Sequence, residues 1–261
     1  MWPFKRGPVV DADTAEWHAE NFAWLVETFG GNDAFSEATL VLPRPGFFPS
    51  DGEVGHSRAL RIFERVKHYC GMEEWPVGLV EDDNPAAEAA LLSPAALVHG
   101  RHAQGTFSIA DGDVQISYTP ALLADPQRLI ATFAHELGHY LLATAPTRPP
   151  CSDDENEFLT DLTAVYLGFG VFVANTVFEF EAISDGTRQG WRMGRSGYLP
   201  ERDVMFATAL FIAVKGLDPE PACECLKPHL AKLLRSALRQ LAVDQRWVAK
   251  IRTSIPAQTE L

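Results

Sequence analysis

Cysteine and positive charge are both scarce in this sequence. Its 261 residues include only four cysteines, which are too few and too scattered for a disulfide framework. They are Cys70, Cys151, Cys223 and Cys225. Lys and Arg number 22 against 35 Asp and Glu, which leaves a net charge of −13. Nucleic acids and anionic membrane surfaces recruit clustered cations, so we expect no nucleic-acid partner and no electrostatic attachment to a membrane.

Long apolar runs are also rare. The N-terminus carries two positive charges, but Asp11, Asp13 and Glu16 follow at once, so we expect no secretory signal and a reducing, cytoplasmic location. One stretch, 158–178, has 21 residues with Asp161 as its single charge among apolar neighbours, and it is long enough to cross a bilayer. We predict a buried core helix instead, because acidic and small residues share one of its faces, which suits contact with protein and not with lipid.

The rest of the composition is that of an ordinary globular chain, 46% hydrophobic and 22% charged. Alternating polarity on both sides of Asp111-Gly112 predicts a β-hairpin made of 106–110 and 113–118. Helical spacing of apolar residues predicts several helices. The expected helices cover 14–29, 56–70, 125–143 and 222–243, another helix begins after residue 152, and further strand candidates are 39–42 and 77–80.

The clearest chemical signal lies on the helix that Asp125 and Pro126 open as N-cap and first-turn residue. The segment His135-Glu-Leu-Gly-His139 matches the H-E-x-x-H pattern, in which two histidines one turn apart can hold a zinc ion. The apolar residues of this helix fall on the side opposite His139. We expect that side to pack in the core while both histidines, with Glu136 beside them, face the other way. The motif alone also occurs by chance, so a third ligand is needed.

A second helix supplies carboxylates. Ser152-Asp-Asp-Glu155 is a capping-box sequence directly after two prolines, so a helix is expected to begin there. One face beyond it is lined by two acids a turn apart and then by two small residues: Glu157, Asp161, Ala164 and Gly168. That face suits close contact with another helix. Because the loop 144–151 is short, we expect the two helices to pack antiparallel with Glu157 near the histidines.

The H-E-x-x-H motif at 135–139, followed 18 residues after His139 by Glu157 within an N-E-x-x-T-D pattern, resembles the gluzincin metallopeptidases of the thermolysin type. The resemblance implies that His135, His139 and Glu157 are zinc ligands and that Asp161 orients a ligand histidine. It covers roughly 129–170. The same segment is similar to poorly characterised bacterial zincin-like proteins, which implies no substrate. The chain departs from metzincins, which have Gly and a third His at positions that are Leu and Ala here.

The resemblance to zinc peptidases of this type also implies roles for residues that do not bind the metal. Zinc lowers the pKa of a bound water, Glu136 accepts its proton, and the hydroxide attacks a polarised carbonyl. Such enzymes have another donor that stabilises the oxyanion. Tyr198, in a glycine-rich segment, is the leading candidate, although a tyrosine that anchors the next helix explains this residue at least as well. Arg192, Arg195 and His229 are the other candidates.

Two further pairs of possible ligands are not expected to bind a metal. His99 and His102 are expected to be solvated side chains of a loop. Cys223 and Cys225 fall near the start of a helix, where side chains two positions apart diverge, so neither a disulfide nor a zinc pair is expected.

The sequence therefore predicts an α+β, zincin-like fold, with a small mixed sheet packed on the H-E-x-x-H helix and a mostly helical remainder. Residues 76–261 are the expected catalytic unit, and 1–75 an attached or integrated N-terminal portion. The predicted function is a cytoplasmic zinc-dependent hydrolase, foremost a peptidase, acting on a peptide or protein substrate. The alternative is a non-catalytic, metal-binding protein of the same fold with a regulatory or interaction role. Glu136 favours the enzyme, because a structural site needs no base. Oligomeric state stays open.

Overall fold

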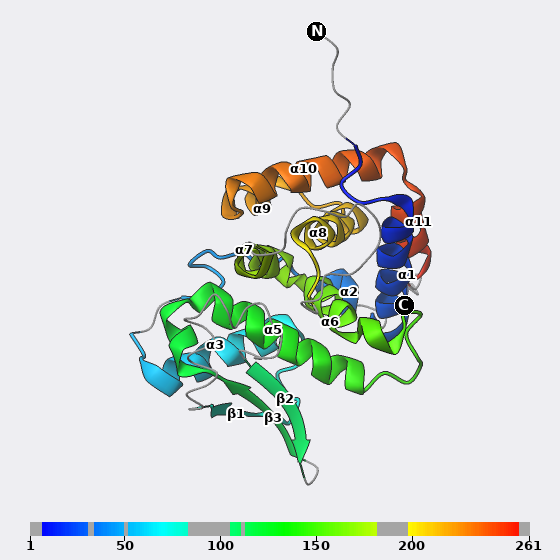
Figure 1. Ribbon diagram of the computed structural model, residues 1–261. Coiled ribbons are helices and arrows are strands. Elements are labelled where there is room, and N and C mark those ends of the chain that lie inside the picture. The colour runs from blue at the N-terminus through cyan, green and yellow to red at the C-terminus, as the bar shows by residue number, and fades with distance from the viewer. Residues whose placement is uncertain are drawn as a thin grey trace, which may run out of the picture.

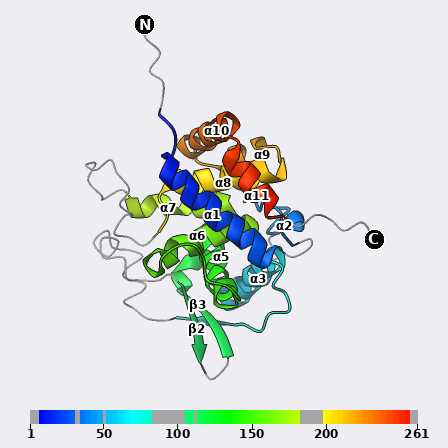
Figure 2. The same ribbon diagram turned by 90° about the vertical axis from the view of Figure 1, so that its right-hand side faces the viewer.

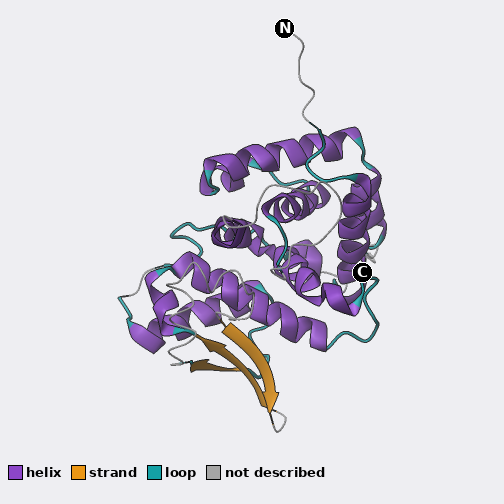
Figure 3. Ribbon diagram, viewed as in Figure 1, coloured by secondary structure: helices purple, strands orange, loops and turns teal. Residues whose placement is uncertain are grey.

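The computed structural model describes residues 7–30, 34–49, 52–82, 105–110, 113–181 and 198–255. Within these ranges the chain is mainly helical, with three strands gathered at one end of the molecule (Figure 3). In chain order the elements are α1 Ala12–Phe29, α2 Ala34–Glu37, α3 Gly55–Tyr69, β1 Gly78–Glu81, β2 Gly105–Ala110, β3 Asp113–Tyr118, η2 Pro120–Ala124, α5 Pro126–Ala143, η3 Asp153–Glu155, α6 Asn156–Ala164, η4 Val165–Phe169, α7 Gly170–Glu181, α8 Glu201–Lys215, α9 Glu220–Cys225, α10 Pro228–Val243 and α11 Arg246–Thr253.

The sheet has the order β1-β3-β2, with β1 parallel and β2 antiparallel to β3. Phe107 of β2 lies opposite Ile116 of β3, and Leu79 of β1 lies opposite Ile116 on the other side. Helix α5 packs on β2 and β3, and most other helices lie beyond it (Figure 1). The α+β class, the small mixed sheet, the hairpin and the strand near 77–80 are thus confirmed.

Two predicted elements are wrong. Residues 39–42 form no strand, because the N–H of Val41 donates to the carbonyl of Gly168 in a helical segment at 2.9 Å instead of joining a sheet. The expected helix 222–243 is two helices, α9 and α10, with extended backbone at Leu226 between them. Pro228 opens α10, and since proline disfavours helical backbone at the residue before it, the helix cannot run through this point.

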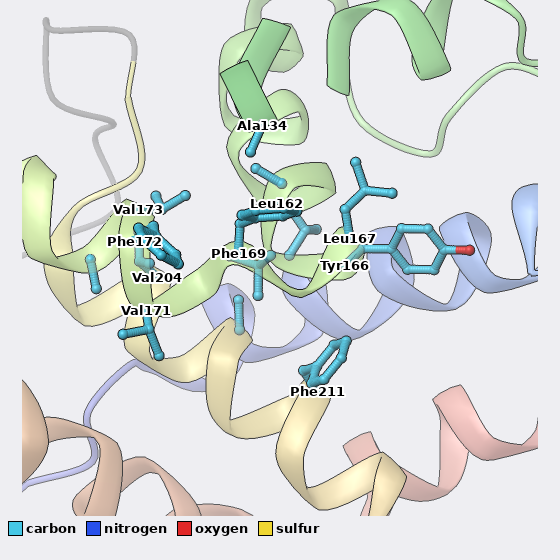
Figure 4. Close-up of a cluster of buried hydrophobic side chains, with 14 of the residues drawn as sticks. Ala134, Leu162, Tyr166, Leu167, Phe169, Val171, Phe172, Val173, Val204 and Phe211 are labelled. Carbon is cyan, nitrogen blue, oxygen red and sulfur yellow. The ribbon is translucent and has the colours of Figure 1, made fainter. Parts of the chain in front are cut away.

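The segment 153–176 is a helical stretch of 24 residues with a kink at Gly168, and among the described residues it is the one stretch long and apolar enough to cross a membrane. Its apolar window is 94% buried inside the protein, in accord with a core helix. Figure 4 shows its Leu162, Phe169 and Phe172 beside Val204 and Phe211 of α8. The capping box forms as expected, with Ser152 and Glu155 bonded to each other.

The N-terminal helix α1 lies against α6, α8 and α11 (Figure 2). Its buried Phe22 and Leu25 belong to the same hydrophobic core as Phe133 of α5 and Phe211 of α8. The first 75 residues and the rest of the chain therefore share one core. All four cysteines are free, as the scarcity of cysteine led us to expect.

The helical stretch is kinked within Val165–Phe169, where the backbone of Gly168 leaves helical geometry. Gly168 has φ +96°, and a Cβ built there would lie 2.1 Å from the carbonyl oxygen of Thr39. A side chain at Gly168 would thus meet the segment before α3, whereas the sequence assigned this residue to the face that contacts another helix. The close contact between α5 and α6 uses Gly138 instead, where a Cβ would stand 3.3 Å from Thr160.

We expect Gly168→Ala to lower the free energy of unfolding by about 3 kcal/mol, because strain at positive φ and overlap with the Thr39 backbone add together. The control is Gly216→Ala, at φ +66° with nothing within 4 Å, which should cost only about 1 kcal/mol. Urea denaturation measures both values. Equal losses in the two variants would contradict the close approach at Gly168.

Candidate metal centre

Helices α5 and α6 bring three potential metal ligands together. The Nε2 atoms of His135 and His139 lie 3.3 Å and 3.5 Å from Oε2 of Glu157. One ligand atom from each residue lies within 4.8 Å of the others, and among the described residues no further group of this kind occurs. The two rings meet edge to face, with centroids 4.8 Å apart. These three residues could hold a metal ion.

The spacing of these atoms fits a small, tetrahedrally coordinated ion. Zinc binds imidazole nitrogen and carboxylate oxygen at about 2.0–2.2 Å, so two donors at a tetrahedral angle stand about 3.4 Å apart. Both nitrogen–oxygen distances to Glu157 agree with this value. Glu157 is also the most open of the three, with a side chain 47% exposed against 12% for His135. The centre thus has a buried side and a side open to solvent.

The outer nitrogens of both histidines are engaged by α6. Nδ1 of His135 donates to Oδ1 of Asp161 at 2.9 Å, and Oδ2 of Asp161 accepts the backbone N–H of Leu199 at 2.8 Å. Nδ1 of His139 lies 3.3 Å from the hydroxyl of Thr160, which itself donates to the carbonyl of Asn156. The hydroxyl hydrogen is therefore occupied, so Thr160 accepts from the imidazole. Both Nε2 atoms are left as acceptors that can ligate a metal.

Thr160 was not assigned a role from the sequence. The available signal was its position directly before Asp161 in the N-E-x-x-T-D pattern. Gly138 makes this contact possible, because it lies between the two histidines and allows Thr160 to approach the backbone of α5. The glycine of the H-E-L-G-H segment thus serves the packing that orients His139.

The ionisable groups of the centre shift one another's pKa values. Hydrogen bonds from His135 and His139 hold the pKa of Glu157 well below its usual range. Burial alone would lower the pKa of His135, but the carboxylates of Asp161 and Glu157 outweigh burial and raise it to about 10. The site therefore favours a cation among its carboxylates, whether a proton or a metal ion.

Glu136 lies beside this cluster and outside it. Glu136 is only 6% exposed, and burial raises the pKa of its carboxyl group. The charges of both histidines and a hydrogen bond from the backbone of Phe107 act in the opposite direction. Phe107 is on β2, and its ring is stacked over that of His139 with centroids 6.4 Å apart. The edge of the sheet thus borders the metal centre at Glu136.

Tyr198 is near the cluster, with its ring centroid 5.6 Å from that of His135. Burial and the charges of Asp161, Glu157 and Glu136 raise its pKa, so the hydroxyl stays protonated. Of the other three candidates for the oxyanion donor, His229 pairs with Glu201 at 2.9 Å. Arg192 and Arg195 lie outside the described residues. His99 and His102 also lie outside them.

Asp161→Asn should weaken zinc retention without abolishing it. The carboxylate accepts two N–H groups at once, whereas an asparagine side chain has one acceptor oxygen and would turn its amide hydrogens toward one of these donors. Loss of such an outer partner costs about 10- to 100-fold in metal affinity. Competition with a chelator measures the change, and Asp153→Asn, an exposed acid on the same segment, is the control. Equal affinity in Asp161→Asn and wild type would contradict the orienting role.

No protein-family model, no curated protein and no solved structure matches the chain. The assignment of a metal site therefore rests on the geometry described above.

Proposed function

We propose that this protein is a zinc-dependent hydrolase of the zincin type, acting as a peptidase, with His135, His139 and Glu157 as the zinc ligands. The observation that carries the proposal is the buried Glu136, which adjoins a ligand and is not one of the donors. A purely structural metal site needs its ligands and an outer layer of hydrogen bonds. It gains nothing from a further buried carboxylate, whose desolvation costs free energy.

The surroundings of Glu136 suit proton transfer. When bound, zinc supplies a Lewis acid that acidifies a water molecule and polarises a substrate carbonyl. The desolvated Glu136 is a stronger proton acceptor than an exposed glutamate, because its pKa is raised. It takes the proton of the attacking water and returns it to the nitrogen of the leaving amine. The backbone of Phe107 steadies the carboxylate in this role.

Tyr198 is the proposed donor to the oxyanion. Its protonated hydroxyl can donate a hydrogen bond, and its ring packs against His135. The next residue, Leu199, is tied to Asp161 through its backbone N–H. This tie supports the position of Tyr198 relative to the ligand helices, which oxyanion stabilisation requires.

A peptide substrate would pair with the free edge of β2. Strand β3 lies on one side of β2, and within the described residues no strand lies on the other. The backbone N–H of Phe107 points to Glu136 and not to β3. In an antiparallel strand the N–H and C=O of one residue point to the same side, so the carbonyl of Phe107 also faces this edge. An extended peptide added there would run past Glu136, and main-chain pairing would tolerate many sequences.

A broad peptide library tests the proposal, with the zinc-loaded wild-type protein and the same protein after chelation. We expect cleavage that disappears with the metal and returns when zinc is restored. If the zinc-loaded protein cleaves nothing in the library or in a cytosolic extract, the non-catalytic, metal-binding alternative replaces the enzyme.

A further inference from the structure

Arg128 stands on the same side of α5 as the two metal-binding histidines. It precedes His135 by seven residues, and at about 100° per residue its direction from the helix axis differs from that of His135 by about 20°. His139 differs by about 40° in the same sense. Seven residues correspond to about 10 Å along the axis. Arg128 therefore lies in line with the metal centre, about two turns from it, toward the N-terminal end of α5.

One edge of the Arg128 guanidinium is buried. Its Nε and Nη2 atoms are shielded from solvent and form no hydrogen bond to the described residues. The side chain has other interactions within the protein, but its five N–H donors leave room for a further acceptor. Buried donors nearly always have an acceptor, and Nε with one Nη is the pair that a single carboxylate binds with both oxygens. The buried edge of Arg128 is thus shaped for a carboxylate.

The charge of Arg128 reaches the metal centre. Asp161, Glu157 and Glu136 raise the pKa of the Tyr198 hydroxyl, together with burial, and the charge of Arg128 acts in the opposite direction. Arg128 is therefore close enough to influence the same hydroxyl as the three carboxylates of the centre. It brings a positive charge to the border of a site that is otherwise rich in acids.

The direction of β2 decides which end of a peptide would approach Arg128. Strand β2 packs alongside α5 (Figure 1). The ring of Phe107 lies against Tyr140, whereas Tyr118, the strand partner of Gly105, lies against Phe133. From residue 107 back to 105, β2 thus approaches the N-terminal end of α5. A peptide paired antiparallel with β2, the commoner arrangement of strands, runs toward that end with its C-terminal part.

We propose that Arg128 binds the C-terminal carboxylate of the substrate and so makes this protein a carboxypeptidase, an inference that rests on the function proposed above. An extended residue spans about 3.5 Å, so the distance of about 10 Å along α5 leaves room for one to three residues beyond the cleaved bond. Hydrolysis adds the hydroxyl of water to the carbonyl carbon of that bond and a proton to its nitrogen. It releases a C-terminal fragment of this length.

Peptides of one sequence with different ends test the assignment on the full-length, zinc-loaded protein. Amidation of the C-terminus should lower kcat/KM by about 30-fold, because a charged, bidentate contact is lost, whereas acetylation of the N-terminus should change it by less than about twofold. An amidated peptide ending in glutamate should be cleaved as slowly as one ending in glutamine. Equal cleavage of acid and amide, or faster cleavage of the glutamate amide, would overturn the proposal and leave a peptidase of another specificity.

Variants of Arg128 locate the contact. Arg128→Gln should lower kcat/KM for the free acid by about 30-fold and for the amide by less than about twofold. Arg128→Lys keeps the charge without the planar fork and should restore only part of the preference. Arg148→Gln, the control, removes the same charge at an exposed residue between α5 and α6 and should keep the wild-type preference. Equal losses on acid and amide in Arg128→Gln would contradict binding of the terminal carboxylate.

Affinity measurements separate this inference from the proposed hydrolysis. Zinc-loaded Glu136→Gln is expected to hold the peptide without cleaving it, so calorimetric titration measures binding directly. The free acid should bind about 30-fold more tightly than the amide, and adding Arg128→Gln should make the two affinities equal. Equal affinities before that change, or a difference that survives it, would overturn the proposal even where the wild type cleaves peptides. A difference that depends on Arg128 would support the carboxylate site even where no cleavage is found.

Discussion

Replacing Glu136 with Gln is expected to reduce peptide hydrolysis by about 10²- to 10⁴-fold while zinc stays bound, the range that general acid–base catalysis contributes. Gln preserves the volume of the buried side chain, and its carbonyl oxygen can still accept from the backbone of Phe107. It cannot accept the proton of the attacking water. Steady-state cleavage of a library-derived peptide measures the loss, and elemental analysis measures the zinc.

The matched control for this variant is Glu74→Gln, which makes the same chemical change at an exposed position. Its hydrolytic rate and zinc content should equal those of the wild type. If Glu136→Gln keeps the full rate, the hydrolysis belongs to a contaminant or to another site. If Glu136→Gln loses zinc together with activity, the carboxylate supports the metal, and its assignment as the base fails.

Purified wild-type protein is expected to contain one zinc ion per chain, and His139→Ala to lose zinc affinity by well over about 100-fold, more than the loss of an outer partner costs. Glu157→Ala should behave in the same way, because its Oε2 completes the set of three donors. Each variant leaves two donors, too few for a site that also keeps a position open. Elemental analysis and chelator competition measure both variants.

His56→Ala is the control for the ligand variants, since it removes an imidazole that lies beside Tyr118 and Glu81 and outside the cluster. It should retain zinc. Full zinc occupancy in Glu157→Ala would transfer the third-ligand role to another group. A wild-type protein that binds no zinc from a zinc-buffered solution would end the metallopeptidase proposal.

The parts of the fold that could be predicted are those governed by local chemistry. Asp125 caps α5 as its sequence indicates, by accepting the N–H of Arg128, and the alternating polarity of β2 and β3 matches their pairing. The failures arise where the partner of a segment is distant in sequence. Val41 has the apolar neighbours of a strand, but its N–H finds Gly168, 127 positions away, and not another strand. The spacing of apolar residues indicates which residues are buried, but it does not indicate which segment they pack against.

Helical spacing alone indicates which residues could act together at the candidate metal centre. Helical periodicity puts His135 and His139 on one face of α5, and Glu157 and Asp161 on one face of α6, because 3.6 residues per turn fix directions within a single helix. How the two faces meet depends on the packing of the whole molecule. Gly138 lets Thr160 reach His139, the edge of β2 brings the backbone of Phe107 to Glu136, and Tyr198 arrives beside His135 from the segment before α8.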